Sequence, residues 1–313
     1  LLAFMLFGLA EAFRSGTHKG MIMDYLKLQN RDDQAANYYG HTRSWSMVGS
    51  ALSALMAGFI VLYGGSYESI FLYSIIPYAL NFLLIISYPG SLDRSLEPAG
   101  HKKRRRIGYA SRMLLDLLKQ ASVLRILYSS AVHTAYLRAV KDYIQLVMIN
   151  LAVLLPFMMH LEEKQKGGIF IGVSYFLIFL ASAYASRFSS FIASRSHRNM
   201  TWITLLASFL FGMVSGMAFK MEFWLISLMA FALIYVMENI RKPLLTGAIA
   251  DQVPKEILTS VISAQSLLRT IITALLALVF GIFADHFGVG VSLFSISALL
   301  LLISLLVPVG QKA

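Results

Sequence analysis

Long runs of apolar residues alternate with short polar segments along most of the chain. Nine of these runs are about 18–25 residues long or longer, the length that a helix needs to cross about 30 Å of hydrocarbon. The apolar positions are continuous rather than alternating, so a membrane β-barrel is not expected. The pattern predicts an all-α, polytopic bundle of membrane helices. The nine predicted spans are residues 1–26, 44–63, 69–88, 122–155, 169–186, 200–219, 221–245, 258–283 and 289–307.

The fourth run, 122–155, is too long for one straight crossing and contains a polar cluster. In the first of two possible courses, the helix is kinked and continues through Leu155, with the cluster in an interior cavity. In the second, the helix ends at the outer membrane interface and residues 147–159 lie along the membrane. The sequence leaves both courses open. The cluster consists of Arg138, Lys141, Asp142, Tyr143 and Gln145.

Composition supports the membrane assignment. Hydrophobic residues make up 58% of the 313 positions and charged residues 14%, whereas soluble domains average about 25% charged residues. The chain has no cysteine, which excludes disulfides and thiolate metal sites. It has no His-Glu-x-x-His motif and no phosphate-binding loop. We therefore expect no enzymatic activity, no catalytic residue, no bound metal and no cofactor.

The 27 Lys and Arg residues lie mostly beyond alternate ends of the apolar runs. They are concentrated around Asn30, in the linker 89–120, in 187–198 and in 241–255. The opposite ends carry Lys164, Lys166 and Lys220. Because basic residues favour the cytoplasmic side, we expect the linker and the C-terminus to be cytoplasmic. The net charge of +11 then reflects topology, and nucleic acid is not an expected partner.

The linker 89–120 separates a region 1–88 from a region 121–313. It contains a basic run, 101–106, and an amphipathic stretch, 112–119. Such a stretch is expected to lie on anionic lipid headgroups. Position 1 is Leu and lies inside an apolar run, so we expect the natural chain to begin upstream. The absence of cysteine and the short loops indicate a prokaryotic inner membrane.

The first and seventh runs share five residues at a constant offset. A Glu-x-x-Arg pair inside two apolar helices is unusual, because intramembrane charges are costly. Two similar halves of about six helices are a transporter architecture. With such a repeat, 1–26 is the fourth helix of the first half, and three helices are missing before it. The matching sets are Glu11, Arg14, Gly20, Ile22 and Asp24, and Glu238, Arg241, Gly247, Ile249 and Asp251.

With this repeat and the basic linker, the chain resembles the major facilitator superfamily from the family's fourth helix to its twelfth. In both halves an acidic residue is followed by a turn residue of the family's pattern, Arg31 or Pro254. The resemblance implies two pseudo-symmetric six-helix halves, the first incomplete. It also implies a monomeric secondary active transporter that moves a small solute by alternating access, coupled to H+ or Na+. The alternative is a non-transporting sensor or assembly protein on the same scaffold.

The family's antiporter motif on its fifth helix reads G-x-x-x-G-P-x-x-G-G. This chain has small residues at the corresponding positions but no proline, which disfavours a drug/proton antiporter. Small residues also let helices approach closely. The resemblance places the small residues of 181–186, on the eighth helix, opposite them. The fifth-helix residues are Gly49, Ser53, Ala54, Ala57 and Gly58.

The candidate cavity residues come first from the repeated pairs, Glu11 with Arg14 and Glu238 with Arg241. Their i, i+3 spacing allows pairing on one helix face, within the hydrocarbon span. In the family, the fourth and tenth helices line the central cavity. The four residues therefore either bind solute and couple protons, or form structural ion pairs. The 138–145 cluster is expected to join the cavity, while His133 is either a proton acceptor or a packed histidine.

A second candidate group lies at the cytoplasmic ends of helices. Asp24 and Asp251 are positioned to pair with basic loop residues of a neighbouring hairpin and so to hold a cytoplasmic gate closed. The alternative is ordinary solvated charge. The basic candidates, which loosely match the family's loop between its eighth and ninth helices, are Arg187, Arg195 and Arg198.

Overall fold

The computed structural model describes residues 21–22, 25–26, 29, 31, 34–64, 66–88, 121–154, 160–252 and 258–306. Within these ranges, side chains are described except at 35–36, 121–123, 126, 190–199, 246–252, 258–260 and 262–264. Most of the first predicted span, the whole linker 89–120 and the C-terminal residues from 307 lie outside the described part. The division into two halves joined by this linker therefore stays a prediction.

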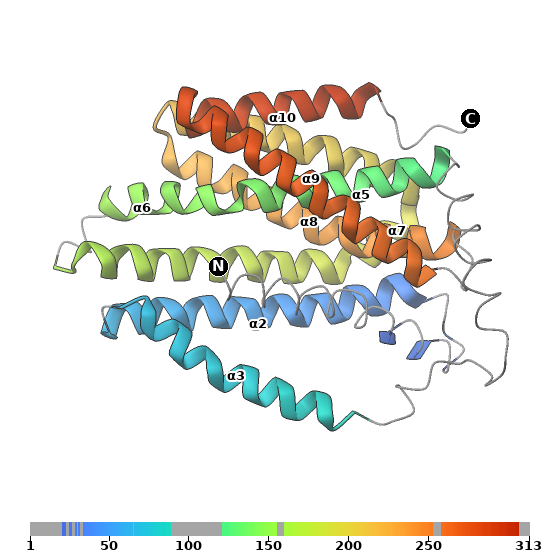
Figure 1. Ribbon diagram of the computed structural model, residues 1–313, viewed down its shortest axis with the longest axis horizontal. Helices are drawn as coiled ribbons and strands as arrows, with labels where there is room; N and C mark the ends of the chain where they lie inside the picture. Colours follow the sequence, from blue (N-terminus) through green and yellow to red (C-terminus); the bar gives the residue numbers. More distant parts are fainter. Residues whose placement is uncertain are drawn as a thin grey trace.

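The described residues form helices and no strand, as the apolar runs predicted. The helices run roughly along one common axis as a bundle (Figure 1). They are α2 (Ala35–Gly64), α3 (Glu68–Ile86), α5 (Ala121–Val140), the short 3-10 turn η2 (Lys141–Tyr143), α6 (Ile144–Leu154), α7 (Glu163–Lys220), α8 (Trp224–Gln252), α9 (Leu258–Phe287) and α10 (Val289–Leu306).

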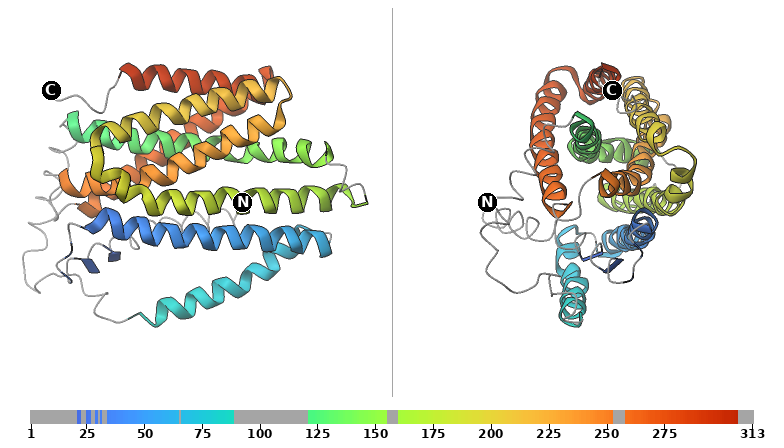
Figure 2. Two further views of the ribbon diagram at one scale, coloured as in Figure 1. Left: turned by 180° about the vertical axis from the view of Figure 1, so that it is seen from behind. Right: turned by 90° about the vertical axis from the view of Figure 1, so that its right-hand side faces the viewer.

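Seven stretches in the described part are long and apolar enough to cross a membrane. Two of them, Glu163–Ser189 and Met200–Lys220, belong to α7, and Figure 2 shows this helix turning back between them. The others are Asn37–Gly64, Glu68–Ile86, Trp224–Leu245, Gln265–Phe287 and Val289–Leu306. The chain is thus a multi-pass bundle of membrane helices. The predicted span 122–155 is not among the seven: α5 has 20 residues but is not apolar enough, and α6 has only 11 residues.

The backbone of the fourth apolar run follows the first of its two predicted courses, while the cavity predicted for its polar cluster is not tested. The helix is interrupted at η2 and then continues as α6, which extends along the bundle toward the end opposite the start of α5 (Figure 1). The side chains of Ile144, Val147, Met148 and Ala152 are buried, and α6 contacts α7 and α8. The alternative, in which residues 147–159 lie along the membrane surface, is therefore wrong for the described part, 147–154.

The predicted packing between small residues occurs where α2 crosses the first half of α7. The backbones approach closely at Gly58 and Gly172, where a Cβ built on Gly172 would lie 2.8 Å from the Gly58 Cα. Further along, the Ser186 hydroxyl donates to the Gly40 carbonyl at 3.1 Å. The Gly58–Gly172 contact lies outside the predicted partner face 181–186. A Cβ added to Gly49, another of the predicted residues, would meet no atom within 4 Å.

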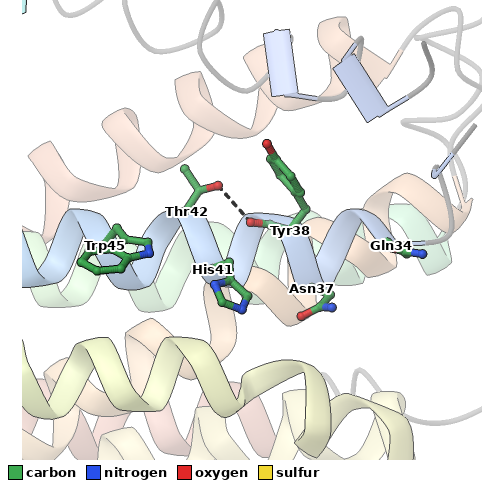
Figure 3. Close-up of a pocket in the computed structure, with 6 residues that line it drawn as sticks. All are labelled: Gln34, Asn37, Tyr38, His41, Thr42 and Trp45. Carbon is green, nitrogen blue, oxygen red and sulfur yellow. Dashed lines mark hydrogen bonds between the residues drawn. The ribbon is translucent and has the colours of Figure 1, made fainter. Parts of the chain in front are cut away.

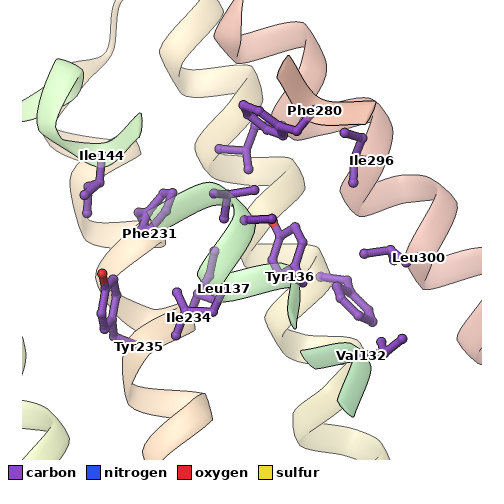
Figure 4. Packing of buried hydrophobic residues seen from close by; sticks show 14 of the residues in the cluster. Val132, Tyr136, Leu137, Ile144, Phe231, Ile234, Tyr235, Phe280, Ile296 and Leu300 are labelled. Atoms are coloured by element: carbon purple, nitrogen blue, oxygen red, sulfur yellow. The ribbon is translucent and has the colours of Figure 1, made fainter. Parts of the chain in front are cut away.

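A core of aliphatic and aromatic side chains fills the space between α5, α6, α7, α8, α9 and α10 (Figure 4). Tyr136 is fully buried and packs edge-on against Phe209, with 5.3 Å between ring centroids. Its hydroxyl shares a 2.6 Å hydrogen bond with the Ser297 hydroxyl of α10. Close approach of α7 and α10 occurs at Gly216 and Gly290, where added Cβ atoms would meet backbone atoms. These contacts link α5, α7 and α10 to one another.

Candidate functional site

Glu238 is the buried carboxylate around which the polar groups of the bundle gather. It lies in α8, seven residues before Leu245, which ends the apolar span. At 1.5 Å per residue this is about 10 Å inside the span. The side chain is 2% exposed. A carboxylate at this depth is costly unless it is paired and hydrogen-bonded.

Three side chains hold the Glu238 carboxylate. Lys242, one helical turn further along α8, places its Nζ 2.9 Å from Oε1. The Thr134 hydroxyl of α5 donates to the same oxygen at 2.7 Å. His133, also on α5, places Nδ1 2.5 Å from Oε2. The carboxylate therefore joins α8 to α5 through His133 and Thr134, while its cation comes from α8 itself.

His133 is fully buried, and only one of its ring nitrogens is engaged within the described part of the chain. Nδ1 meets Glu238, while Nε2 has no hydrogen-bond partner among the described residues. A neutral imidazole that donates from Nδ1 presents a lone pair at Nε2. His133 is thus a packed histidine, one of its two predicted roles. Its Nε2 can also accept a proton, which is the other predicted role.

The predicted ion pair between Glu238 and Arg241 is wrong. Both Arg241 and Lys242 are within one helical turn of Glu238, but it is Lys242 that forms the ion pair. Arg241 has no exposed surface and turns to other helices. Within the described part of the chain, its acceptors are the uncharged groups of Ser129, Thr201 and Thr204.

The guanidinium of Arg241 ties α8 to α5 and to the second half of α7. Nη1 donates to the Thr204 hydroxyl at 3.0 Å and to the Thr201 carbonyl. Nη2 donates to the Ser129 hydroxyl at 2.8 Å and to the Ser129 carbonyl at 3.1 Å. These bonds satisfy most of the guanidinium donors, so Arg241 has a structural role in the described fold, and its predicted place in a solute cavity stays a prediction.

One edge of the polar network is open. The Lys242 side chain is 28% exposed. The half-buried Arg43 of α2 donates from Nε to the Asn239 Oδ1 at 3.1 Å. Arg43 and Arg138 are both close enough to Lys242 for their positive charges to act on its ammonium group. Buried Tyr39 of α2 lies within the same electrostatic field. Among the described residues, this edge therefore carries more positive than negative charge.

The polar cluster near η2 is exposed. Arg138, Lys141, Asp142 and Gln145 are all exposed, and Lys141 pairs with Asp142 at 3.2 Å. The partly buried Tyr143 packs on the ring of Phe280, with 4.4 Å between centroids. No hydrogen bond or ion pair connects this cluster to Glu238 within the described residues. The placement of this cluster in a cavity thus stays a prediction.

Several predicted site residues cannot be placed. Glu11, Arg14 and Asp24 lie outside the described residues, and so do the side chains of Arg195, Arg198 and Asp251. Arg187 is exposed on α7. The cytoplasmic gate therefore stays a prediction. The described residues contain no group of three His, Asp or Glu side chains that could hold a metal ion.

The sequence contained signals for partners that the prediction missed. Lys242 follows Glu238 by four residues, a spacing that puts both on one helix face. On α5, Ser129, Ser130, His133 and Thr134 recur at i, i+1, i+4 and i+5, which forms one polar stripe on an otherwise apolar helix. This stripe faces Glu238 and Arg241 and supplies most of their acceptors and donors.

A separate depression of about 480 Å³ lies on α2 (Figure 3). Helical periodicity puts its lining on the face of α2 opposite Arg43, so it does not belong to the Glu238 network. The lining residues are Gln34, Asn37, Tyr38, His41, Thr42 and Trp45.

No model of a protein family matches this chain, and no curated protein matches it. What the structure establishes is therefore the architecture: a polytopic bundle of membrane helices with a buried polar network between α5 and α8.

Proposed function

We propose that the protein is a secondary active transporter that moves a small solute across the membrane by alternating access. Its scaffold is of the major facilitator type, with two six-helix halves, and α5 to α10 belong to the second half. The observation that carries the proposal is the buried Glu238 network with one open, charged edge. Ionisable groups inside membrane spans are costly and are generally retained for solute or ion pathways.

The helices that supply the network support this proposal. In the resemblance, α5 with α6 corresponds to the seventh helix, and α8 corresponds to the tenth, which lines the family's central cavity. Glu238 and its partners His133 and Thr134 come from these two helices. A solute in this cavity would lie between the two halves and could be reached from either side in turn.

Two features suit the conformational and ionic steps of transport. The 3-10 turn η2 interrupts the helix between α5 and α6, and such interruptions are frequent at hinges. Glu238 and His133 are titratable groups in direct contact, so a proton is a suitable coupling ion. Protonation of Glu238 would weaken its ion pair with Lys242 and change the contacts that join α5 and α8.

The test is gradient-driven solute uptake by the natural gene product in proteoliposomes, with the variant Glu238→Gln. The amide keeps the shape but loses the charge, and hydrogen bonds to charged groups contribute about 1.5–3 kcal/mol. We expect concentrative uptake to fall at least about tenfold, while the folded fraction is retained. Glu222→Gln, the same change at an exposed turn, is the control. Unchanged uptake in Glu238→Gln would refute the role of this site.

A further inference from the structure

We infer that the solute carried at this site is a small oxyanion, bearing a carboxylate or phosphate group, and that Arg43 and Lys242 bind it. This inference rests on the proposed transport function and names the class of its substrate. It comes from the charge balance at the open edge of the network, from the position of Arg43 within its span, and from the donors that Arg43 leaves unused.

Among the described residues, positive charge exceeds negative charge at this edge. Glu238 is matched by Lys242, and Asp142 is matched by Lys141. Arg43 and Arg138 have no acidic partner within the described part of the chain. Both act on the Lys242 ammonium with like charge. In a membrane span such repulsion is costly, and a bound anion would relieve it.

Arg43 is placed as a binding residue and not as a charge that sets topology. It lies six residues inside the span Asn37–Gly64, which is about 9 Å from the end of that span. An arginine that only sets topology extends to the headgroups or water. Arg43 instead turns inward, where its Nε binds the Asn239 amide oxygen beside Glu238.

The unused donors of Arg43 have the geometry that an oxyanion requires. Nε is engaged by Asn239, which fixes the plane of the guanidinium. Nη1 and Nη2 make no hydrogen bond to another residue in the described part of the chain. A guanidinium presents paired donors in a fork that matches carboxylate and phosphate oxygens. Lys242, 28% exposed, supplies a second cation for the same solute.

The experiment follows solute uptake by the natural gene product in proteoliposomes. Succinate and inorganic phosphate are the anionic probes, glucose is the neutral probe and choline is the cationic probe. A cell extract is offered in parallel, and any component that enters is identified by mass spectrometry. We expect an oxyanion to enter and the neutral and cationic probes to stay outside.

Arg43→Gln removes the charge and the fork while leaving a side chain that can still reach Asn239. We expect the half-saturating concentration of the transported oxyanion to rise at least about tenfold, because charge-assisted hydrogen bonds are lost. Arg43→Lys should recover part of this loss. Lys220→Gln, the same loss of charge at the exposed end of α7, should leave uptake unchanged. Equal unfolding midpoints in detergent would show that Arg43→Gln remains folded.

The outcomes separate this inference from the transport proposal. Entry of a neutral or cationic solute, and of no oxyanion, would overturn the inference but leave transport established. Entry of an oxyanion with unchanged affinity in Arg43→Gln would overturn the assignment of this site. If no probe and no component of the extract enters, both the transport function and the inference are overturned.

Discussion

The close contact between α2 and α7 at Gly172 makes Gly172→Ala a sharp test of their packing. A Cβ at position 172 would lie 2.8 Å from the carbonyl oxygen of Ala54 and 2.8 Å from the Cα of Gly58. Both are backbone atoms in the middle of α2, so rotation of a side chain cannot make room. The added methyl group must push the two helices apart.

The expected cost follows from this geometry. Ordinary contacts begin near 3.4 Å, so the helices must separate by about 0.6 Å, and a gap of that size forfeits about a quarter of the dispersion energy of each affected contact. Overpacking of this kind costs about 1–3 kcal/mol. The better helix propensity of Ala offsets up to about 1 kcal/mol of it. We expect a net loss of about 1–2 kcal/mol in the free energy of unfolding.

The assay is unfolding by sodium dodecyl sulfate in mixed micelles, followed by circular dichroism and by the fluorescence of Trp45 on α2. Gly49→Ala and Gly281→Ala are matched controls, because an added Cβ at either position meets no atom within 4 Å. Both should be neutral or stabilising by up to about 1 kcal/mol. If Gly172→Ala were as stable as these two controls, the close packing of α2 on α7 would be refuted.

Two further stability predictions follow from the buried polar contacts. Lys242→Met should cost about 3–5 kcal/mol, because it leaves the Glu238 carboxylate buried without its cation. The double variant Glu238→Gln/Lys242→Met should recover most of this loss, and strictly additive costs in a double-mutant cycle would contradict the ion pair. Tyr136→Phe should cost only about 0.5–1.5 kcal/mol, because Ser297 keeps a backbone carbonyl as acceptor. The same unfolding assay measures it, with exposed Tyr78→Phe as the control; a loss as large as that of Lys242→Met would count against this reasoning.

The candidate site was predictable in its centre but not in its partners. Glu238 stands out in the sequence because it is an acidic residue within a long apolar run. Arg241 and Lys242 are equally close to it along the helix, and spacing alone favours neither. The structure pairs Glu238 with Lys242 because the hydroxyls of Ser129 and Thr204, on two other helices, draw Arg241 away. Local spacing carries no information about those neighbours.

The sequence by itself determined the architecture. Lipid offers the backbone no hydrogen-bond partners, so the apolar runs must form helices of membrane-spanning length. It also predicted that the small residues of α2 would pack against another helix. Only the tertiary structure decided that Gly58 meets Gly172, that the helix of the fourth run breaks at Lys141–Tyr143, and that His133 reaches Glu238. These contacts depend on how one helix is rotated and shifted against another, and that choice is made by the packing of the whole bundle.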